Sequence, residues 1–82
     1  MPVGEAEVII DALGLKCPLP VLLAQRALNA ASLDTVIALH ADDPLSAIDL
    51  PVFCTREGYT LLGVETSVNA QIFRIRKASP AI

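Results

Sequence analysis

The chain alternates between short runs with a two-residue hydrophobic period and longer runs with a helical period. The short runs predict four strands, over residues 5–11, 35–41, 59–66 and 70–77. The longer runs predict two helices, over residues 18–31 and 45–57. The element order is therefore β-α-β-α-β-β. This order predicts an α+β fold, a two-layer α/β sandwich in which two helices cover one face of a four-stranded mixed sheet.

The alternation within the strands assigns side chains to faces. The continuous run Val8-Ile9-Ile10 predicts burial from both sides, and hence a central place for the first strand. Inward positions are predicted for Ile37, Leu39, Ala41, Phe73 and Ile75, and outward positions for His40, Arg74 and Arg76. The last two strands are separated by three residues, so they are expected to pair as a hairpin.

The sequence predicts the buried face of the first helix and the two ends of the second. The first helix is predicted to bury Pro20, Ala24, Ala27, Leu28 and Ala31. In the second, Pro51 leaves two alternatives: the helix bends there, or it begins only near Asp49, which would cap it with Pro51 in its first turn. The later start is the favoured alternative. Gly58 is expected to end this helix as a C-terminal cap.

The length and composition indicate one domain, residues 1–82, with residues 78–82 as a loose tail. An apolar share of 54% is enough to build a core, and no run approaches the roughly 20 residues that span a bilayer. Residues 1–7 carry acid where an export signal needs a basic segment. We therefore expect a cytoplasmic protein with reduced thiols and no membrane association.

Charge and cysteine spacing exclude several functions. A net charge of −3 argues against binding nucleic acid directly and favours a protein partner or a small substrate. Cys17, His40 and Cys54 lack the short spacings of a zinc site, so no metal is expected. Residue 20 is proline where a dithiol oxidoreductase would have its second cysteine. No cofactor motif is present.

The stretch from Gly14 to Pro20 carries the candidate chemistry. Gly14 offers a left-handed position in the turn, and Pro18 and Pro20 mark a helix start. Cys17 would then be the N-cap, with the free N–H of Leu19 directed at its sulfur. The helix dipole and Lys16 would lower the thiol pKa below the free value of roughly 8.5, which predicts a preformed thiolate nucleophile.

The two cysteines each have a simpler interpretation. Either could be a small buried hydrophobe, and from helix-start chemistry alone this alternative for Cys17 stays open. Cys54 lies between Phe53 and Thr55 on the second helix, which favours an inert core thiol. Asp11 could tune the sulfur site or simply cap the turn after the first strand, and the residues alone favour the turn cap.

The chain resembles the TusA-like (SirA/YedF) sulfur-carrier family almost from end to end. The resemblance is carried by the run Asp11-Ala12-Leu13-Gly14-Leu15-Lys16-Cys17-Pro18-Leu19-Pro20, which holds the family's Cys-Pro-x-Pro motif, and by Ala27-Leu28, Asp43-Pro44, Asp49-Leu50-Pro51 and Ile75-Arg76-Lys77. It implies a two-layer sandwich like the C-terminal domain of a bacterial translation initiation factor. It also implies that Cys17 receives sulfane sulfur as a persulfide and passes it on.

The resemblance also implies the class of partner. A protein donor, either a cysteine desulfurase or a rhodanese-like protein, would load the sulfurtransferase-type carrier, and a protein acceptor would unload it. Relatives serve tRNA thiolation, molybdenum-cofactor supply or sulfur oxidation. The alternative is a non-catalytic RNA- or protein-binding module, which the initiation-factor-like architecture raises. We expect a monomer or a weak dimer.

Two leucines point to a docking surface. Leu19 and Leu22 project away from the predicted core face of the first helix, beside the turn that carries Cys17. Clustered exposed apolar side chains next to a reactive group predict a surface that a partner covers. The alternatives are that the loop at Leu13 and Leu15 folds over them, or that they pack only in a homodimer.

Overall fold

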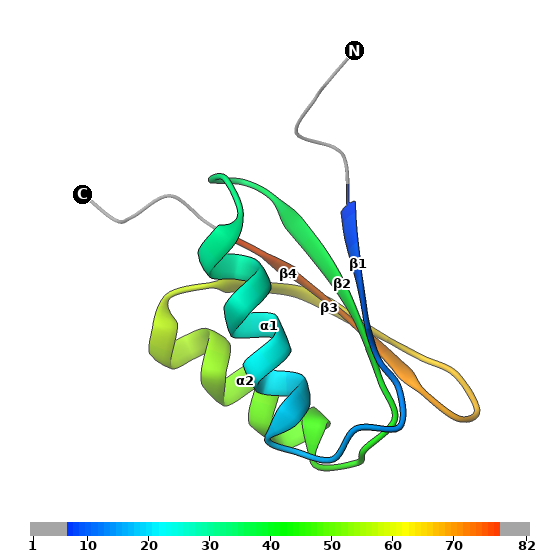
Figure 1. Cartoon of the computed structure of the whole chain (residues 1–82). Helices are drawn as coiled ribbons and strands as arrows, with labels where there is room; N and C mark the ends of the chain where they lie inside the picture. Colours follow the sequence, from blue (N-terminus) through cyan, green and yellow to red (C-terminus); the bar gives the residue numbers. More distant parts are fainter. Residues whose placement is uncertain (1–6, 78–82) are drawn as a thin grey trace.

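The protein folds as a four-stranded sheet with two helices on one face (Figure 1). The computed structural model describes residues 7–77. Its elements are β1 (Glu7–Ala12), α1 (Leu19–Ala30), β2 (Val36–Ala41), α2 (Ser46–Glu57), β3 (Thr60–Thr66) and β4 (Gln71–Arg76). The predicted α+β class, element order and mixed sheet are confirmed. The predicted tail, residues 78–82, and the first two residues predicted for the first strand lie outside the described residues.

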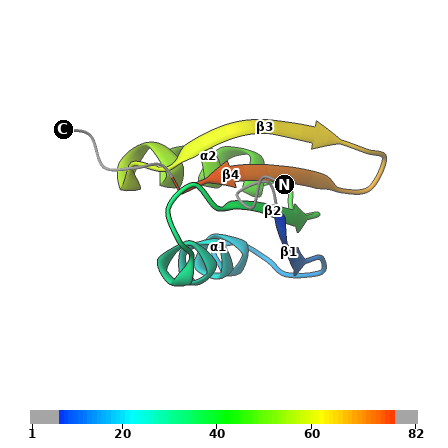
Figure 2. The same ribbon diagram turned by 90° about the horizontal axis from the view of Figure 1, so that it is seen from above.

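The order of strands across the sheet is β1-β2-β4-β3 (Figure 2). β1 and β2 are parallel, and α1 forms the crossover between them. β4 lies between β2 and β3 and is antiparallel to both, so the predicted hairpin of β3 and β4 is confirmed. Because β1 and β2 are adjacent and parallel, their carboxyl ends lie at the same end of the sheet. The loops that follow them therefore meet there.

The core lies between the sheet and the helices. α1 packs against β1 and β2, and α2 packs against β3. The inward positions predicted for β2 and β4 are confirmed, since Ile37, Leu39, Ala41, Phe73 and Ile75 are all buried. From α1, the buried residues are Pro20, Ala24 and Leu28, as the helical period predicts, while Ala27 and Ala31 are half-buried. A two-residue and a helical period were thus sufficient to find this core.

The prediction that β1 is a central strand is wrong. β1 forms an edge of the sheet, and Ile9 is 69% exposed on the face without helices. Its neighbour Ile10 points the other way and packs against the core. A continuous apolar run predicts cover on both faces, but here helices cover one face alone among the described residues.

The uncovered face of the sheet carries an ion-pair network around Arg74. Its Nε donates to Glu7 Oε2 at 3.0 Å on β1, and its Nη1 donates to Glu65 Oε1 at 2.8 Å on β3. Ala38, opposite Arg74 in register, is buried on this face. Arg74 does face outward as predicted, and His40 on the same face is half-buried. The network links β4 to both edge strands, although exposed ion pairs of this kind contribute little stability singly.

α2 begins earlier than predicted. It starts at Ser46 and carries Pro51 inside it, so the favoured start near Asp49 is wrong. The preceding turn explains this, because Asp43 Oδ1 accepts the N–H of Leu45 at 3.1 Å and fixes the chain before the helix. Gly58 ends α2 with a φ of 82°, as predicted. Neither described helix is long and apolar enough to cross a membrane.

Candidate functional site

The loop between β1 and α1 is held by two aspartates. Asp11 Oδ1 accepts the N–H of Leu13 at 3.0 Å, which supports the turn-capping interpretation of this carboxylate. Gly14 has a φ of 81°, so the predicted left-handed position is confirmed. Both carboxylate oxygens of Asp42, in the loop after β2, accept the N–H of Gly14 at 3.0 Å. Hydrogen bonds therefore join the β1–α1 loop to the β2–α2 loop, at the carboxyl ends of the two parallel strands.

Cys17 does not cap α1, and this part of the prediction is wrong. The helix starts at Leu19, with Pro18 at the N-cap position and no side-chain cap. The N–H of Leu19 donates to the carbonyl oxygen of Lys16 at 2.8 Å and not to the sulfur. The Cys17–Pro18 peptide bond is cis. Cys17 thus lies one residue outside the helix end, and its surroundings are set by another part of the chain.

The second loop and the start of α2 hold Cys17. Its N–H donates to Asp43 Oδ2 at 2.8 Å. Its sulfur lies 3.4 Å from Ser46 Oγ, and Ser46 is fully buried. Asp49 lies one turn further along the same side of α2. A half-buried thiol is therefore fixed between the β1–α1 loop and the first turn of α2.

The surroundings favour the protonated form of this thiol. Burial raises the pKa of Cys17 above its ordinary value, the Ser46 hydroxyl lowers it, and the carboxylates of Asp49 and Asp43 raise it, so the pKa is raised on balance. The prediction of a lowered pKa and a preformed thiolate is therefore wrong. A helix dipole acts along the axis within the first turn. The thiol does not occupy the cap position where the dipole would act on it.

Lys16 acts on Asp43 and not on the sulfur. Lys16 is exposed, and its charge is one of the causes that hold the pKa of the Asp43 carboxyl below its usual value. The larger causes are the two hydrogen bonds that Asp43 accepts, from the N–H groups of Cys17 and Leu45. Asp43 therefore stays ionised while it holds the backbone of both loops.

The two prolines of the motif differ in burial. Pro20 is fully buried and belongs to the core face of α1, whereas Pro18 is exposed. Pro18 lines a shallow groove of about 220 Å³ between the two helices, together with Asp49 and Arg56. Pro20 thus fixes the helix against the sheet, and Pro18 borders the accessible surface next to Cys17.

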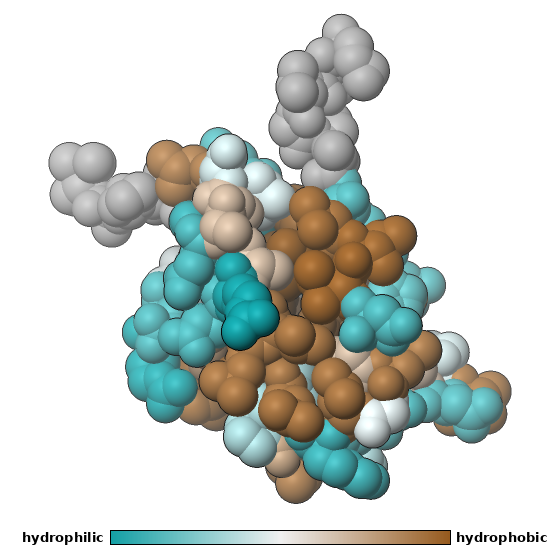
Figure 3. Space-filling view, viewed as in Figure 1, coloured by the Kyte–Doolittle hydropathy of each residue, from teal (hydrophilic) through white to brown (hydrophobic). Residues whose placement is uncertain are grey.

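Apolar side chains gather on the helical face beside the site (Figure 3). On α1, Leu19 is 47% exposed and Leu22 is 51% exposed, as the helical period predicts. On α2, Ile48 and Val52 are also exposed. The loop at Leu13 does not bury Leu19 and Leu22, because they remain half accessible with that loop in place. Their role in docking stays a prediction.

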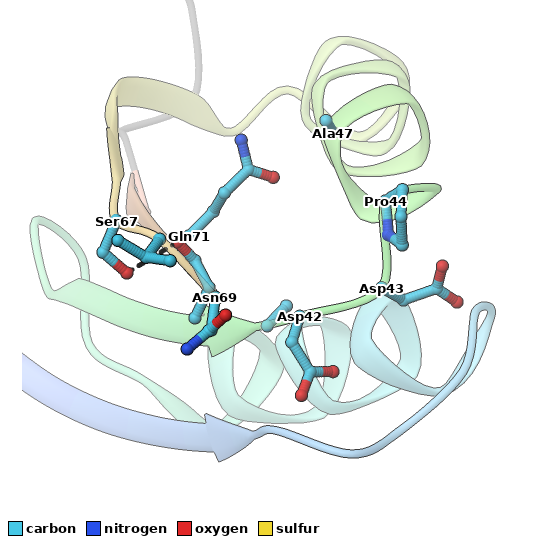
Figure 4. Close-up of a pocket in the computed structure, with 10 residues that line it drawn as sticks. Asp42, Asp43, Pro44, Ala47, Ser67, Asn69 and Gln71 are labelled. Carbon is cyan, nitrogen blue, oxygen red and sulfur yellow. Dashed lines mark hydrogen bonds between the residues drawn. The ribbon is translucent and has the colours of Figure 1, made fainter.

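A second cavity lies on the far side of the aspartate loop. It has a volume of about 330 Å³, with Asp42 and Asp43 at one side and Ser67 and Gln71 opposite (Figure 4). The hydrogen bonds of both aspartates run to the Cys17 loop. These two residues consequently separate the cavity from the thiol.

Cys54 has a different setting. It is 2% exposed in the core, and burial raises its pKa to about 11. The predicted core position is confirmed. A thiol with this pKa and no access to solvent is a poor nucleophile at neutral pH.

The sequence interpretation missed the roles of three residues. Asp43, Ser46 and Asp49 surround Cys17, although they follow it by 26 to 32 positions. The sequence places Asp43 only in the Asp43-Pro44 pair of the family pattern, and it predicts Asp49 as a possible helix cap. The signal that could have found them is the parallel pairing of the first two strands, which brings the following loops together.

The fold and the site define a class: a small α+β protein that holds one half-buried thiol where two loops meet. The chain belongs to the sulfurtransferase TusA family, whose family model matches residues 8–77. Membership implies a sulfurtransferase or sulfur carrier that interacts with other proteins. The match includes Cys17 and the three residues around it.

Proposed function

We propose that this protein is a sulfur carrier that accepts sulfane sulfur on Cys17 as a persulfide and transfers it to an acceptor protein. The observation that carries the proposal is the contrast in access between the two thiols. Cys17 is half-buried at the loop edge, whereas Cys54 is enclosed in the core. Only Cys17 offers a sulfur that a second macromolecule can reach without unfolding.

The atoms and electrons of the proposed sulfur transfer balance without a cofactor. Cys17 attacks the outer sulfur of a donor persulfide, the donor's S–S bond breaks, and the donor leaves as a thiolate. Because the pKa of Cys17 is raised, its proton has to leave on attack, and the departing donor thiolate takes it. The sum is Cys17–SH plus donor–S–SH giving Cys17–S–SH plus donor–SH. Delivery repeats this exchange with an acceptor thiol.

Family membership supports a protein donor, and we propose a cysteine desulfurase or a rhodanese-like protein in the cytoplasm. The proposed destination of the sulfur is tRNA thiolation, cofactor biosynthesis or other sulfur trafficking. The surface formed by Leu19 and Leu22 is the proposed docking site, because it adjoins Cys17 and is apolar. A partner seated there would also shield the persulfide from stray thiols.

Mass measurement tests the carrier function. Incubation with a cysteine desulfurase and cysteine should add one sulfur atom, and a reductant should remove it. The gain should vanish in Cys17→Ser and persist in Cys54→Ala, which is the matched control because alanine buries no new polar group. A gain that depends on Cys54, or no gain in the wild type, would overturn the proposal.

Introducing a charge into the apolar surface tests the docking site. In Leu22→Glu the fold and the alkylation rate of Cys17 should be unchanged, while sulfur delivery to an acceptor protein should fall about tenfold. Val64→Glu, at a position on β3 that is 42% exposed compared with 51% for Leu22, is the control. Delivery at the wild-type rate in Leu22→Glu would place the partner elsewhere.

A further inference from the structure

The Ser46 hydroxyl is buried against the reacting atom. Ser46 is the first residue of α2, its side chain has no exposed surface, and its Oγ lies 3.4 Å from Cys17 Sγ. Its backbone N–H is used elsewhere, donating to the carbonyl oxygen of Asp43 at 2.9 Å. Within residues 7–77 no buried side-chain nitrogen or oxygen lacks a partner. Packing therefore holds this hydroxyl on the sulfur.

The direction of this hydrogen bond depends on the state of the sulfur. A thiol can donate or accept, so in the resting protein either atom can supply the proton. A thiolate has no proton and can only accept, which obliges the hydroxyl to donate. Hydrogen bonds to a charged acceptor are about twice as strong as neutral ones. The contact therefore strengthens whenever Sγ becomes negative.

We propose that Ser46 is a catalytic residue of sulfur transfer whose hydroxyl donates a hydrogen bond to Cys17 Sγ as negative charge develops there. The inference rests on the proposed function of Cys17 as a persulfide carrier. In delivery, an acceptor attacks the outer sulfur, the Sγ–Sδ bond breaks, and its electron pair remains on Sγ. Ser46 touches the atom that receives this charge, as a group stabilising a leaving group must.

The other groups around the sulfur do not supply this stabilisation. Asp43 and Asp49 are carboxylates, and they oppose an anion at Sγ. Lys16 acts on Asp43, and Arg56 shares a groove with Asp49 and forms a 3.7 Å ion pair with Glu57. The Ser46 hydroxyl lowers the pKa of Cys17, whereas burial, the hydrogen bond and charge of Asp49, and the charge of Asp43 all raise it.

The two half-reactions should depend on Ser46 differently. In loading, a stabilised thiolate is more abundant but intrinsically less nucleophilic, and these effects partly cancel. In delivery, Sγ is the leaving group, and a leaving thiolate of lower pKa departs faster with no opposing effect. Loss of the hydroxyl should therefore slow delivery more than it slows loading at alkaline pH.

The first experiment measures the thiolate directly, without any persulfide. Iodoacetamide alkylation of Cys17 is followed against pH in Ser46→Ala and in the shape-matched pair Ser46→Thr and Ser46→Val. The variants without a hydroxyl should show profiles displaced to higher pH, with about threefold to tenfold slower alkylation near neutral pH. Ser46→Thr and Ser32→Ala, an exposed control, should follow the wild type. Coincident profiles for Ser46→Thr and Ser46→Val would overturn the inference.

The second experiment measures delivery. The protein is loaded with inorganic polysulfide, freed of excess, and treated with cyanide, so that Cys17–S–SH plus CN⁻ gives Cys17–SH plus SCN⁻. Thiocyanate should form about threefold to tenfold more slowly in Ser46→Val than in Ser46→Thr. Equal rates would overturn the catalytic role even if the pH profile moved. If the wild type takes up no sulfane sulfur, the carrier function fails, and the alkylation profile still decides the contact with Ser46.

Discussion

Cys17 and Cys54 are two thiols of one small domain with opposite settings. Cys17 lies at the meeting point of two loops, half-buried, with one hydroxyl and two carboxylates around it. Cys54 lies in the last turn of α2 among core side chains. Burial raises the pKa in both, and in Cys54 burial is the one resolved cause.

The comparison shows that reactivity here cannot come from a ready thiolate. Both thiols are mostly protonated at neutral pH, so what separates them is access and the polar group at the sulfur. Ser46 gives Cys17 a donor that acts when charge develops, and Cys54 has none among its resolved influences. A resting thiol that is held neutral is also less prone to oxidation, because thiolate is the form that oxidants attack.

The largest expected difference is in alkylation. Iodoacetamide should modify Cys17 about a hundredfold or more faster than Cys54 in the native protein, because Cys54 has a pKa of about 11 and no solvent access. Mass mapping of the labelled cysteine measures this ratio. In concentrated urea the two rates should converge. Equal native rates would show that the core around Cys54 opens readily.

A smaller effect is expected on stability, with opposite signs at the two sites. Cys17→Ala leaves the buried Ser46 hydroxyl without its partner and should be about 1 kcal/mol less stable than Cys17→Ser. At Cys54 the order should reverse, since serine there buries a hydroxyl among apolar side chains. Urea unfolding of the four variants measures both differences. The same order at both positions would refute the contrast.

The smallest expected effect concerns charge. Asp49→Asn removes one of the carboxylates that raise the pKa of Cys17, so this pKa should fall and more thiolate should be present at neutral pH. Alkylation of Cys17 should become about threefold faster, and that of Cys54 should not change. High salt should move the wild type part of the way towards the variant. Slower alkylation in Asp49→Asn would instead identify the carboxylate as a proton acceptor.

Much of the fold followed from local pattern. The strand periods placed Ile37, Phe73 and Ile75 in the core, and the glycines at 14 and 58 each marked a left-handed position. These features depend on neighbours within a few residues, which the sequence displays directly. The errors arose where distant segments compete. The edge position of β1 depends on β4 inserting beside β2, and no local pattern in residues 7–12 reports that.

The candidate site likewise has some features that local sequence predicts and others that only distant segments determine. The motif identified the thiol, and its exposed neighbours Leu19 and Leu22 followed from the helical period. The ionisation state of Cys17 could not be predicted from the motif. It depends on Asp43, Ser46 and Asp49, which lie after β2 and in the first turn of α2. Proximity to Lys16 in sequence was a misleading guide, since that ammonium group acts on Asp43.

The sequence by itself determined the order of the elements, the buried faces of α1, β2 and β4, the family, and the cysteine of the Cys-Pro-x-Pro motif, because each depends on short-range spacing. The tertiary structure alone decided the state of that cysteine. Parallel pairing of β1 and β2 brings their carboxyl ends to the same end of the sheet. The loop after β2 and the first turn of α2 therefore lie against the sulfur of Cys17. A thiol pKa is determined by charges and donors within a few ångströms, and chain folding chooses those neighbours.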